Sequence, residues 1–251
     1  MQALMMNSQL MISSILKHAE KNFPEVEMVS VTVDSPRHRQ TYKTFARRCR
    51  QLANARSALG AEFGDRIGTM AWNDFRHMEV DYGVSGSGMV CHTINPKLFP
   101  EQVAYIINHA EDKILFVDVL VMPLLEALKD HLSKVETVVV MTDRAHMPES
   151  TLPNVVCYEE LLAEQSDEYE WPQFDENTAG GMCYTSGTTG HPKGVVYSHR
   201  STLLHALSGA LPDVTTASNM ETTLPVVPMF HVNAWGAPYA ALMVGMKMVL
   251  P

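Results

Sequence analysis

The segment that decides the interpretation of this chain is Tyr184-Thr185-Ser186-Gly187-Thr188-Thr189-Gly190-His191-Pro192-Lys193-Gly194. It places hydroxyl side chains, glycines and a lysine between two runs of β-forming residues. Glycines let successive backbone N–H groups converge, hydroxyls add donors, and a lysine brings a charge that a phosphate can share. The composition therefore predicts a phosphate-binding loop between two strands, the second at about 194–198, followed by a helix from about His199.

The spacing differs from that of a Walker phosphate loop. Lys193 lies three residues beyond Gly190, follows a proline and precedes a glycine, whereas the Walker pattern G-x-x-x-x-G-K-[ST] places the lysine directly after a glycine. A glycine- and threonine-rich hairpin without a ligand is the alternative, because such residues are ordinary in loops. The order of the residues in the run favours the phosphate-binding interpretation.

Bulk properties restrict the partners of the chain. Its 251 residues carry a formal net charge of -9, which disfavours nucleic acid and anionic membrane surfaces as general partners. The four cysteines are widely spaced and form no C-x-x-C pair, as expected in a reducing cytoplasm. The apolar stretch 226–250 is interrupted by prolines, glycines and Lys247, so it predicts buried core and no membrane span.

Predicted strands and helices alternate along the first part of the chain. Strands are expected at 66–72, 89–94, 113–117 and 135–141, with helices at 74–87, from Pro100 and at 123–132. Before them, helices at 10–22 and 44–59 flank a predicted hairpin at 27–42. This alternation predicts the α/β class, with mostly parallel sheets flanked by helices.

A division of the chain is expected near residue 170. The stretch 159–176 holds eight acidic residues and no lysine or arginine, and we interpret it as a solvated connection in preference to an acidic docking motif. We therefore predict a first α/β subdomain at 1–170 and the start of a second at 171–251. The second should contain a helix at 201–211, a strand at 222–227, a helix of small residues after Gly236 and a strand at 246–250.

The order of residues in the loop resembles a known family signature. Tyr-Thr-Ser-Gly-Thr-Thr-Gly-x-Pro-Lys-Gly, followed by Ser198-His199-Arg200, is similar to the run found in AMP-forming acyl-CoA synthetases and their adenylate-forming relatives, the luciferases and peptide-synthetase adenylation domains. Phe230-His231-x-x-x-Trp235 resembles the segment that lines the acyl pocket of fatty acyl-CoA synthetases. Taken alone, His231 and Trp235 would more often be core residues. Their position after the loop favours a site.

The resemblance implies a reaction and a set of site residues. In that family a carboxylate attacks the α-phosphate of ATP to give acyl-adenylate and pyrophosphate, and CoA then displaces AMP. By resemblance, the β- and γ-phosphates would be held by Thr185, Ser186, Gly187, Thr188, Thr189, Gly190 and Lys193. Thr185 would also contact Mg²⁺, His231 would lie near the reacting carboxylate of a fatty acid, and Trp235 would line or gate the tail pocket.

Members of that family are much longer than this chain. We therefore expect the chain to be the front half of the large N-terminal domain, with the main catalytic groups beyond Pro251 and no ligase activity on its own. The alternatives are an adenylation domain or luciferase-like relative that acts on another carboxylate, and a non-catalytic nucleotide-binding or interaction module. Uncovered apolar surface around Trp235, Met243 and Met246 would favour a homo-oligomer.

Overall fold

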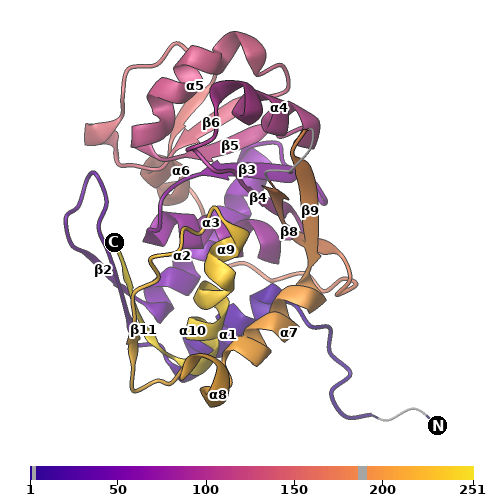
Figure 1. The fold of residues 1–251 in the computed structure, drawn as a ribbon. Helices are drawn as coiled ribbons and strands as arrows, with labels where there is room; N and C mark the ends of the chain where they lie inside the picture. The colour runs from indigo at the N-terminus through magenta and orange to yellow at the C-terminus, as the bar shows by residue number, and fades with distance from the viewer. Residues whose placement is uncertain (2–3, 186–190) are drawn as a thin grey trace.

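The computed structural model describes residues 1, 4–185 and 191–251, and within them the larger sheet runs in the order β7, β6, β5, β3, β4, β8, β9 (Figure 1). Its strands are β3 (Arg66–Met70), β4 (Val90–Thr93), β5 (Ile114–Val117), β6 (Thr137–Val140), β7 (Val155–Cys157), β8 (Ala179–Thr185) and β9 (Lys193–Ser198). Neighbours are parallel except β8 and β9, which are antiparallel. The predicted α/β class and the mostly parallel sheet are confirmed.

Helices cover both faces of this sheet, as predicted. The side chains of β5 alternate: Leu115 and Val117 join the cluster under α4 (Pro100–Ala110) and α5 (Met122–Leu128), while Ile114 and Phe116 join the cluster under α2 (Tyr42–Ala58) and α3 (Phe75–Gly86). Successive side chains of a strand point to opposite faces, so a sheet covered twice needs apolar residues throughout. The fully buried sequences of β5 and β6 meet this requirement.

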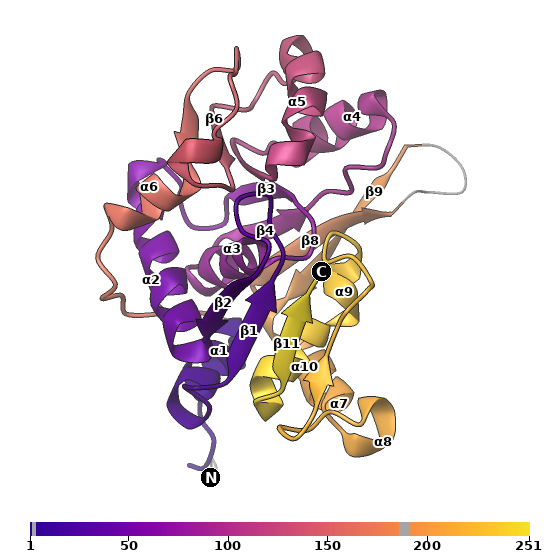
Figure 2. The ribbon, with the colours of Figure 1, turned by 90° about the vertical axis from the view of Figure 1, so that its left-hand side faces the viewer.

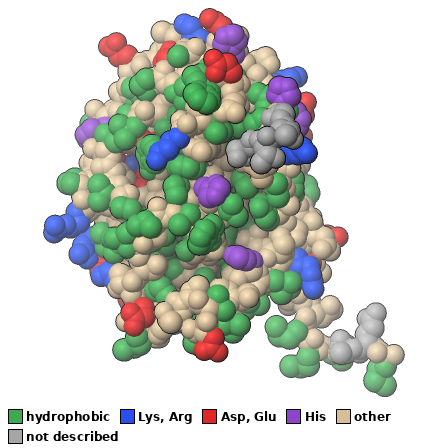
Figure 3. Space-filling model, in the orientation of Figure 1, with side chains coloured by type: hydrophobic (Ala, Val, Ile, Leu, Met, Phe, Trp, Pro, Cys, Tyr) green, Lys and Arg blue, Asp and Glu red, His purple; other side chains and the backbone are tan. Residues whose placement is uncertain are grey.

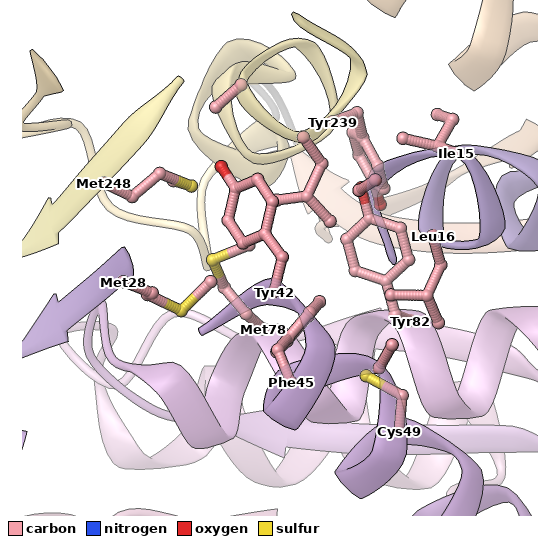
Figure 4. Packing of buried hydrophobic residues seen from close by; sticks show 14 of the residues in the cluster. Ile15, Leu16, Met28, Tyr42, Phe45, Cys49, Met78, Tyr82, Tyr239 and Met248 are labelled. Carbon is pink, nitrogen blue, oxygen red and sulfur yellow. The ribbon is translucent and has the colours of Figure 1, made fainter. Parts of the chain in front are cut away.

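A smaller four-stranded sheet joins segments from the two ends of the chain. Its order is β10 (Thr222–Thr223), β11 (Lys247–Leu250), β1 (Glu27–Ser30) and β2 (His38–Thr41). The predicted hairpin is confirmed by the antiparallel pairing of β1 with β2, and β1 also pairs in parallel with β11, as Figure 2 shows. Under this sheet, α1 (Ile12–Asn22) and α10 (Ala237–Val244) enclose a buried cluster that contains Tyr42, Phe45 and Tyr82 (Figure 4).

The remaining helices are short or lie near the chain's second half. They are α6 (Tyr158–Ala163), α7 (His199–Gly209), α8 (Pro212–Thr215) and α9 (Val232–Trp235), with 3₁₀ turns η1 (Val119–Val121), η2 (Lys129–His131) and η3 (Arg144–His146). The strands predicted on either side of the phosphate loop, and the helix predicted after them, are confirmed by β8, β9 and α7. No helix of the described ranges is long and apolar enough to cross a membrane.

The prediction of a solvated connection at 159–176 is wrong at its start. There α6 carries Glu159, whose carboxylate pairs with Arg48 at 2.9 Å and with Arg76 at 2.7 Å. The strand β7 just before it had no predicted counterpart. Strands from both proposed subdomains occur in each sheet, since β8 and β9 extend the larger sheet and β1 and β2 extend the smaller one. The division at residue 170 stays a prediction.

Two predictions about the last segment need correction. The strand expected at 222–227 is reduced to the two residues of β10, because Pro225 and Pro228 cannot donate backbone hydrogen bonds to a neighbour. The expected apolar exposure holds for Trp235, which is 69% exposed, while Met246 is buried and Met243 is half-buried.

Candidate functional site

The two ends of the predicted phosphate loop lie opposite each other at the edge of the larger sheet. Thr185 at the end of β8 pairs with Lys193 at the start of β9, and the Thr185 hydroxyl donates a long 3.5 Å hydrogen bond to the Lys193 carbonyl oxygen. Both side chains are exposed. The other predicted phosphate ligands, Ser186, Gly187, Thr188, Thr189 and Gly190, lie outside the described residues.

A cavity of about 240 Å³ opens beside these strand ends. It lies at the carboxyl ends of the parallel strands β4 and β8, the edge at which open α/β sheets bind ligands. The described residues that line it are Thr93, Ile94, Asn95, Leu98, Ile106, Cys183, Tyr184, Thr185, Pro192, Tyr197, Phe230, His231 and Val232. None of these described lining residues is acidic, so no carboxylate among them would repel an anionic ligand. His231 and Thr185 thus line the same cavity.

A second cavity of about 280 Å³ adjoins the first, because Tyr197 and Val232 line both. It lies between α7 and the segment 232–239, and its lining is mainly apolar. Ligand sites are commonly apolar clefts with a few oriented polar groups. Here His205 and Asn233 supply polar groups. The two cavities thus lie next to each other, the first at the loop strands and the second reaching Tyr239 of α10.

Trp235 does not line either of these cavities. Its exposed ring borders a third cavity of about 480 Å³, next to the segment 222–227. His231 and Trp235, which the sequence placed in one pocket, therefore face different cavities in this structure. The role of Trp235 in gating a tail pocket stays a prediction.

The segment between these two residues adopts an unusual backbone. Val232, Asn233, Ala234 and Trp235 all have positive φ angles, between 47° and 56°, so α9 is a left-handed turn. It precedes α10, which confirms the helix of small residues predicted after Gly236. For L-residues this conformation costs on the order of 1–2 kcal/mol per residue. Such strain persists only where surrounding contacts hold it, and it is concentrated at functional sites.

Side chains on both sides hold the left-handed turn. The Asn233 amide donates to the Tyr239 hydroxyl at 2.9 Å and approaches Asp81 Oδ1 at 3.5 Å, while His205 Nε2 lies 3.0 Å from the Trp235 carbonyl oxygen. Asp81 is buried, and burial raises its pKa to about 6. The turn is therefore supported by buried polar groups that the sequence alone did not indicate.

Residues of α4 contact both flanks of the predicted phosphate loop. The Tyr184 hydroxyl and His109 Nδ1 form a 2.7 Å hydrogen bond, and Tyr105 stacks on His109 at 5.2 Å and on His191 at 4.7 Å. Burial, followed by the nearby Asp112 carboxylate, raises the pKa of Tyr184 to about 12, so this phenol is neutral at physiological pH. Tyr105 and His109 were missed by sequence reasoning, although their i, i+4 spacing places both on one side of α4.

Beneath Tyr184 lies a fully buried pair. His92 Nδ1 and Asp112 Oδ2 are 2.7 Å apart, and the His92 ring lies 5.3 Å from that of Tyr184. Burial is the main cause that raises the pKa of Asp112. The pair gives β8 a rigid polar support below the start of the loop.

Comparison with known proteins assigns the chain to a family. The family described as AMP-binding enzyme matches residues 16–251. The chain belongs to this family. A 3-methylmercaptopropionyl-CoA ligase of Ruegeria lacuscaerulensis is 50% identical over 247 residues, which are 98% of this chain and 46% of that protein. A medium-chain fatty-acid CoA ligase of Ectopseudomonas oleovorans is 49% identical over 247 residues, 45% of its length. The chain thus spans less than half the length of these AMP-binding relatives.

The fold is also that of solved structures of AMP-binding enzymes. A long-chain fatty-acid CoA ligase from Archaeoglobus fulgidus matches with a TM-score of 0.81 and 20% identity, over 95% of this chain and 46% of that one. At this identity the likeness concerns the fold. It agrees with the expected placement of the chain in the N-terminal part of an adenylate-forming enzyme.

The described residues provide few ligands for a magnesium ion, so most of its ligands would have to come from nucleotide phosphates and water. Thr185 supplies one hydroxyl, and no group of three His, Cys, Asp or Glu side chains in residues 1, 4–185 and 191–251 could hold a metal. Mg²⁺ usually keeps several waters and binds through one or two carboxylates together with substrate phosphates. Thr185 would therefore fit only as an auxiliary ligand to an ion that is bound mainly by nucleotide phosphates.

Proposed function

We propose that the protein to which this chain belongs is an AMP-forming ligase that joins a fatty acid to CoA. The carboxylate of the fatty acid would attack the α-phosphate of ATP, forming acyl-AMP and releasing pyrophosphate. The CoA thiol would then attack the acyl group and displace AMP. The observation that carries the proposal is the shared cavity: Phe230 and His231 line the same space as Thr185 at the carboxyl edge of the sheet. This supports a site in which the predicted phosphate loop would lie next to the entrance for a carboxylate.

The residues of the chain suit the first half-reaction. Lys193 and the hydroxyl of Thr185 would stabilise the outer phosphates, where charge-assisted hydrogen bonds are stronger than neutral ones. His231 would orient the carboxylate, and the adjoining apolar cavity would take up its tail away from water. A bound Mg²⁺ would neutralise phosphate charge.

The substrate proposal has two forms. The medium-chain relative supports an aliphatic fatty acid. The relative named as a 3-methylmercaptopropionyl-CoA ligase supports a short thioether acid as a second candidate. Both acids place an apolar chain behind a carboxylate, as the two adjoining cavities would require.

We also propose a cytoplasmic location and self-association of the protein. All four cysteines are buried free thiols, which supports a reducing compartment such as the cytoplasm. Hydrophobic side chains are spread over the face shown in Figure 3, and large exposed ones on α7 include Leu204 and Leu207. Such a surface supports self-association.

The test is a screen of carboxylic acids with the full-length protein. We expect ATP-dependent pyrophosphate release with straight-chain fatty acids or 3-methylmercaptopropionate, followed by CoA-dependent release of AMP. In the same assay, Lys193→Ala should raise the ATP KM about tenfold to a hundredfold, because it removes a charge-assisted hydrogen bond. Lys134→Ala, an exposed lysine near the opposite edge of the sheet, is the control. Activity confined to amino acids or aryl acids would contradict the fatty-acid assignment.

A further inference from the structure

The side-chain amide of Asn73 binds a segment more than 150 residues away. Its Nδ2 donates to the carbonyl oxygens of Pro225 and Val227, both at 2.9 Å, and its Oδ1 accepts from the Met229 N–H at 2.7 Å. Asn73 is 6% exposed. A buried amide with both of its ends occupied by backbone groups fixes those groups closely.

The segment 225–229 needs such a partner because it cannot extend the smaller sheet. The strand β10 ends at Thr223, and the prolines at 225 and 228 have no N–H to donate. Buried backbone groups must find other partners or lose stability. With two donated bonds and one accepted bond, the Asn73 amide supplies what a neighbouring strand would otherwise provide.

Asn73 is itself held between a strand of the larger sheet and a helix that covers this sheet. It lies between the end of β3 and α3, and its neighbour Asp74 caps α3 by accepting from the His77 N–H at 2.7 Å. On its other side, Trp72 packs edge-on against Phe230 at 5.7 Å, and Lys97 lies over the Trp72 ring at 5.2 Å. The loop Trp72–Asn73 therefore contacts the chain on both sides of Met229.

Phe230 and His231 come directly after the segment that Asn73 holds. Both line the cavity that Thr185 also lines. Thr185 ends β8, which belongs to the same sheet as β3. The Asn73 amide thus connects the segment bearing His231 to the rigid sheet that carries the loop strands.

We propose that Asn73 is a positioning residue that sets the place of Phe230 and His231 relative to the loop strands. This inference rests on the proposed function, because it assigns to Phe230 and His231 the reception of the acyl substrate. Asn73 itself does not line the cavity and acts through the backbone of residues 225–229.

The test uses Asn73→Asp in the full-length protein with the acid that the wild type activates best. The change keeps the side-chain shape and the acceptor for Met229, but it removes both donors and sets a carboxylate oxygen against two carbonyl oxygens. We expect the acyl KM to rise about tenfold, from the loss of the two hydrogen bonds, while the ATP KM stays near the wild-type value.

The chain offers a matched control in Asn54. Its Nδ2 also donates to two backbone carbonyl oxygens, those of Ser166 at 2.7 Å and Glu168 at 2.9 Å. Neither acceptor residue lines the cavities at the loop strands. Asn54→Asp removes the same kind of clamp and should leave both KM values unchanged.

Asn73→Ser provides a second variant without added charge, and thermal unfolding is measured for every variant. If the wild type is active and the acyl KM is unchanged in both Asn73 variants, the inference about Asn73 is wrong while the proposed function stands. Failure of both variants to fold while Asn54→Asp folds would assign Asn73 a purely structural role and also overturn it. A wild type that releases no pyrophosphate with any acid would overturn the proposed function and this inference together.

Discussion

Asp81 illustrates how a single buried carboxyl group couples this site to pH. Its folded pKa of about 6 exceeds the ordinary value of 3.8, mainly because burial disfavours the charged form. Between these two pH values the folded chain retains a proton that the unfolded chain has released. Raising the pH through this window therefore lowers the free energy of unfolding, and the loss is complete above about pH 6.

We predict that Asp81→Asn removes this loss. The amide is neutral at every pH, so the variant should gain stability relative to wild type as the pH rises from 4 to 7, by roughly 3 kcal/mol at most. Urea unfolding of both proteins at several pH values measures the difference. Comparing the two proteins at each pH cancels other groups that titrate here, such as Asp74, whose pKa burial raises to about 7. A stability difference that does not change with pH would contradict the assignment.

At the scale of elements, α6 is held by ion pairs that the sequence could not indicate. Arg48 binds Glu79 at 2.7 Å and Glu159 at 2.9 Å, and Arg76 binds Glu159 at 2.7 Å and also pairs with Asp34. The guanidinium groups of both arginines also lie near the Phe75 ring. Glu159 thus connects α6 to α2 and α3 at once.

Glu159→Gln should weaken this connection. The change leaves two largely buried arginines without one carboxylate partner, and we expect a loss of about 2–4 kcal/mol in the free energy of unfolding. Glu160→Gln, on the same helix, is the control, because its pair with Arg144 is exposed and 3.6 Å long. Thermal and urea unfolding measure both. Equal effects of the two changes would show that α6 is not held by this network.

The sequence predicts those elements whose signal is local. The strands and helices between residues 66 and 141 follow from apolar runs broken by glycine, proline and capping residues such as Asp74. The loop strands followed from the composition around Thr185 and Lys193. By contrast, β7 is a short, half-buried strand recognised only by its pairing with β6. The left-handed turn at 232–235 has no local signal except Gly236, since its support comes from Asp81, Tyr239 and His205.

At the scale of the whole molecule, the two ends of the chain build one core. The parallel pairing of β1 with β11 joins Met28 to Met248, and Lys247 Nζ lies 2.7 Å from a carboxylate oxygen of Glu27. The buried Tyr42 hydroxyl donates to the Met246 carbonyl oxygen. Because each sheet combines strands from 1–170 and 171–251, neither range can unfold without exposing core of the other.

The 251-residue chain should therefore unfold in a single cooperative transition. Tyr42→Phe should lower the midpoint temperature of this transition without splitting it into two. Removing the hydroxyl leaves a buried carbonyl oxygen without that donor, which costs about 1–3 kcal/mol. Tyr82→Phe is a matched control from the same cluster, because the buried Tyr82 hydroxyl has no hydrogen-bond partner within the described residues (Figure 4). We expect this control to be neutral or stabilising. Calorimetry and near-ultraviolet circular dichroism should give coincident unfolding curves. Two separate transitions would mean that 1–170 and 171–251 fold independently and that the shared sheets contribute little to their coupling.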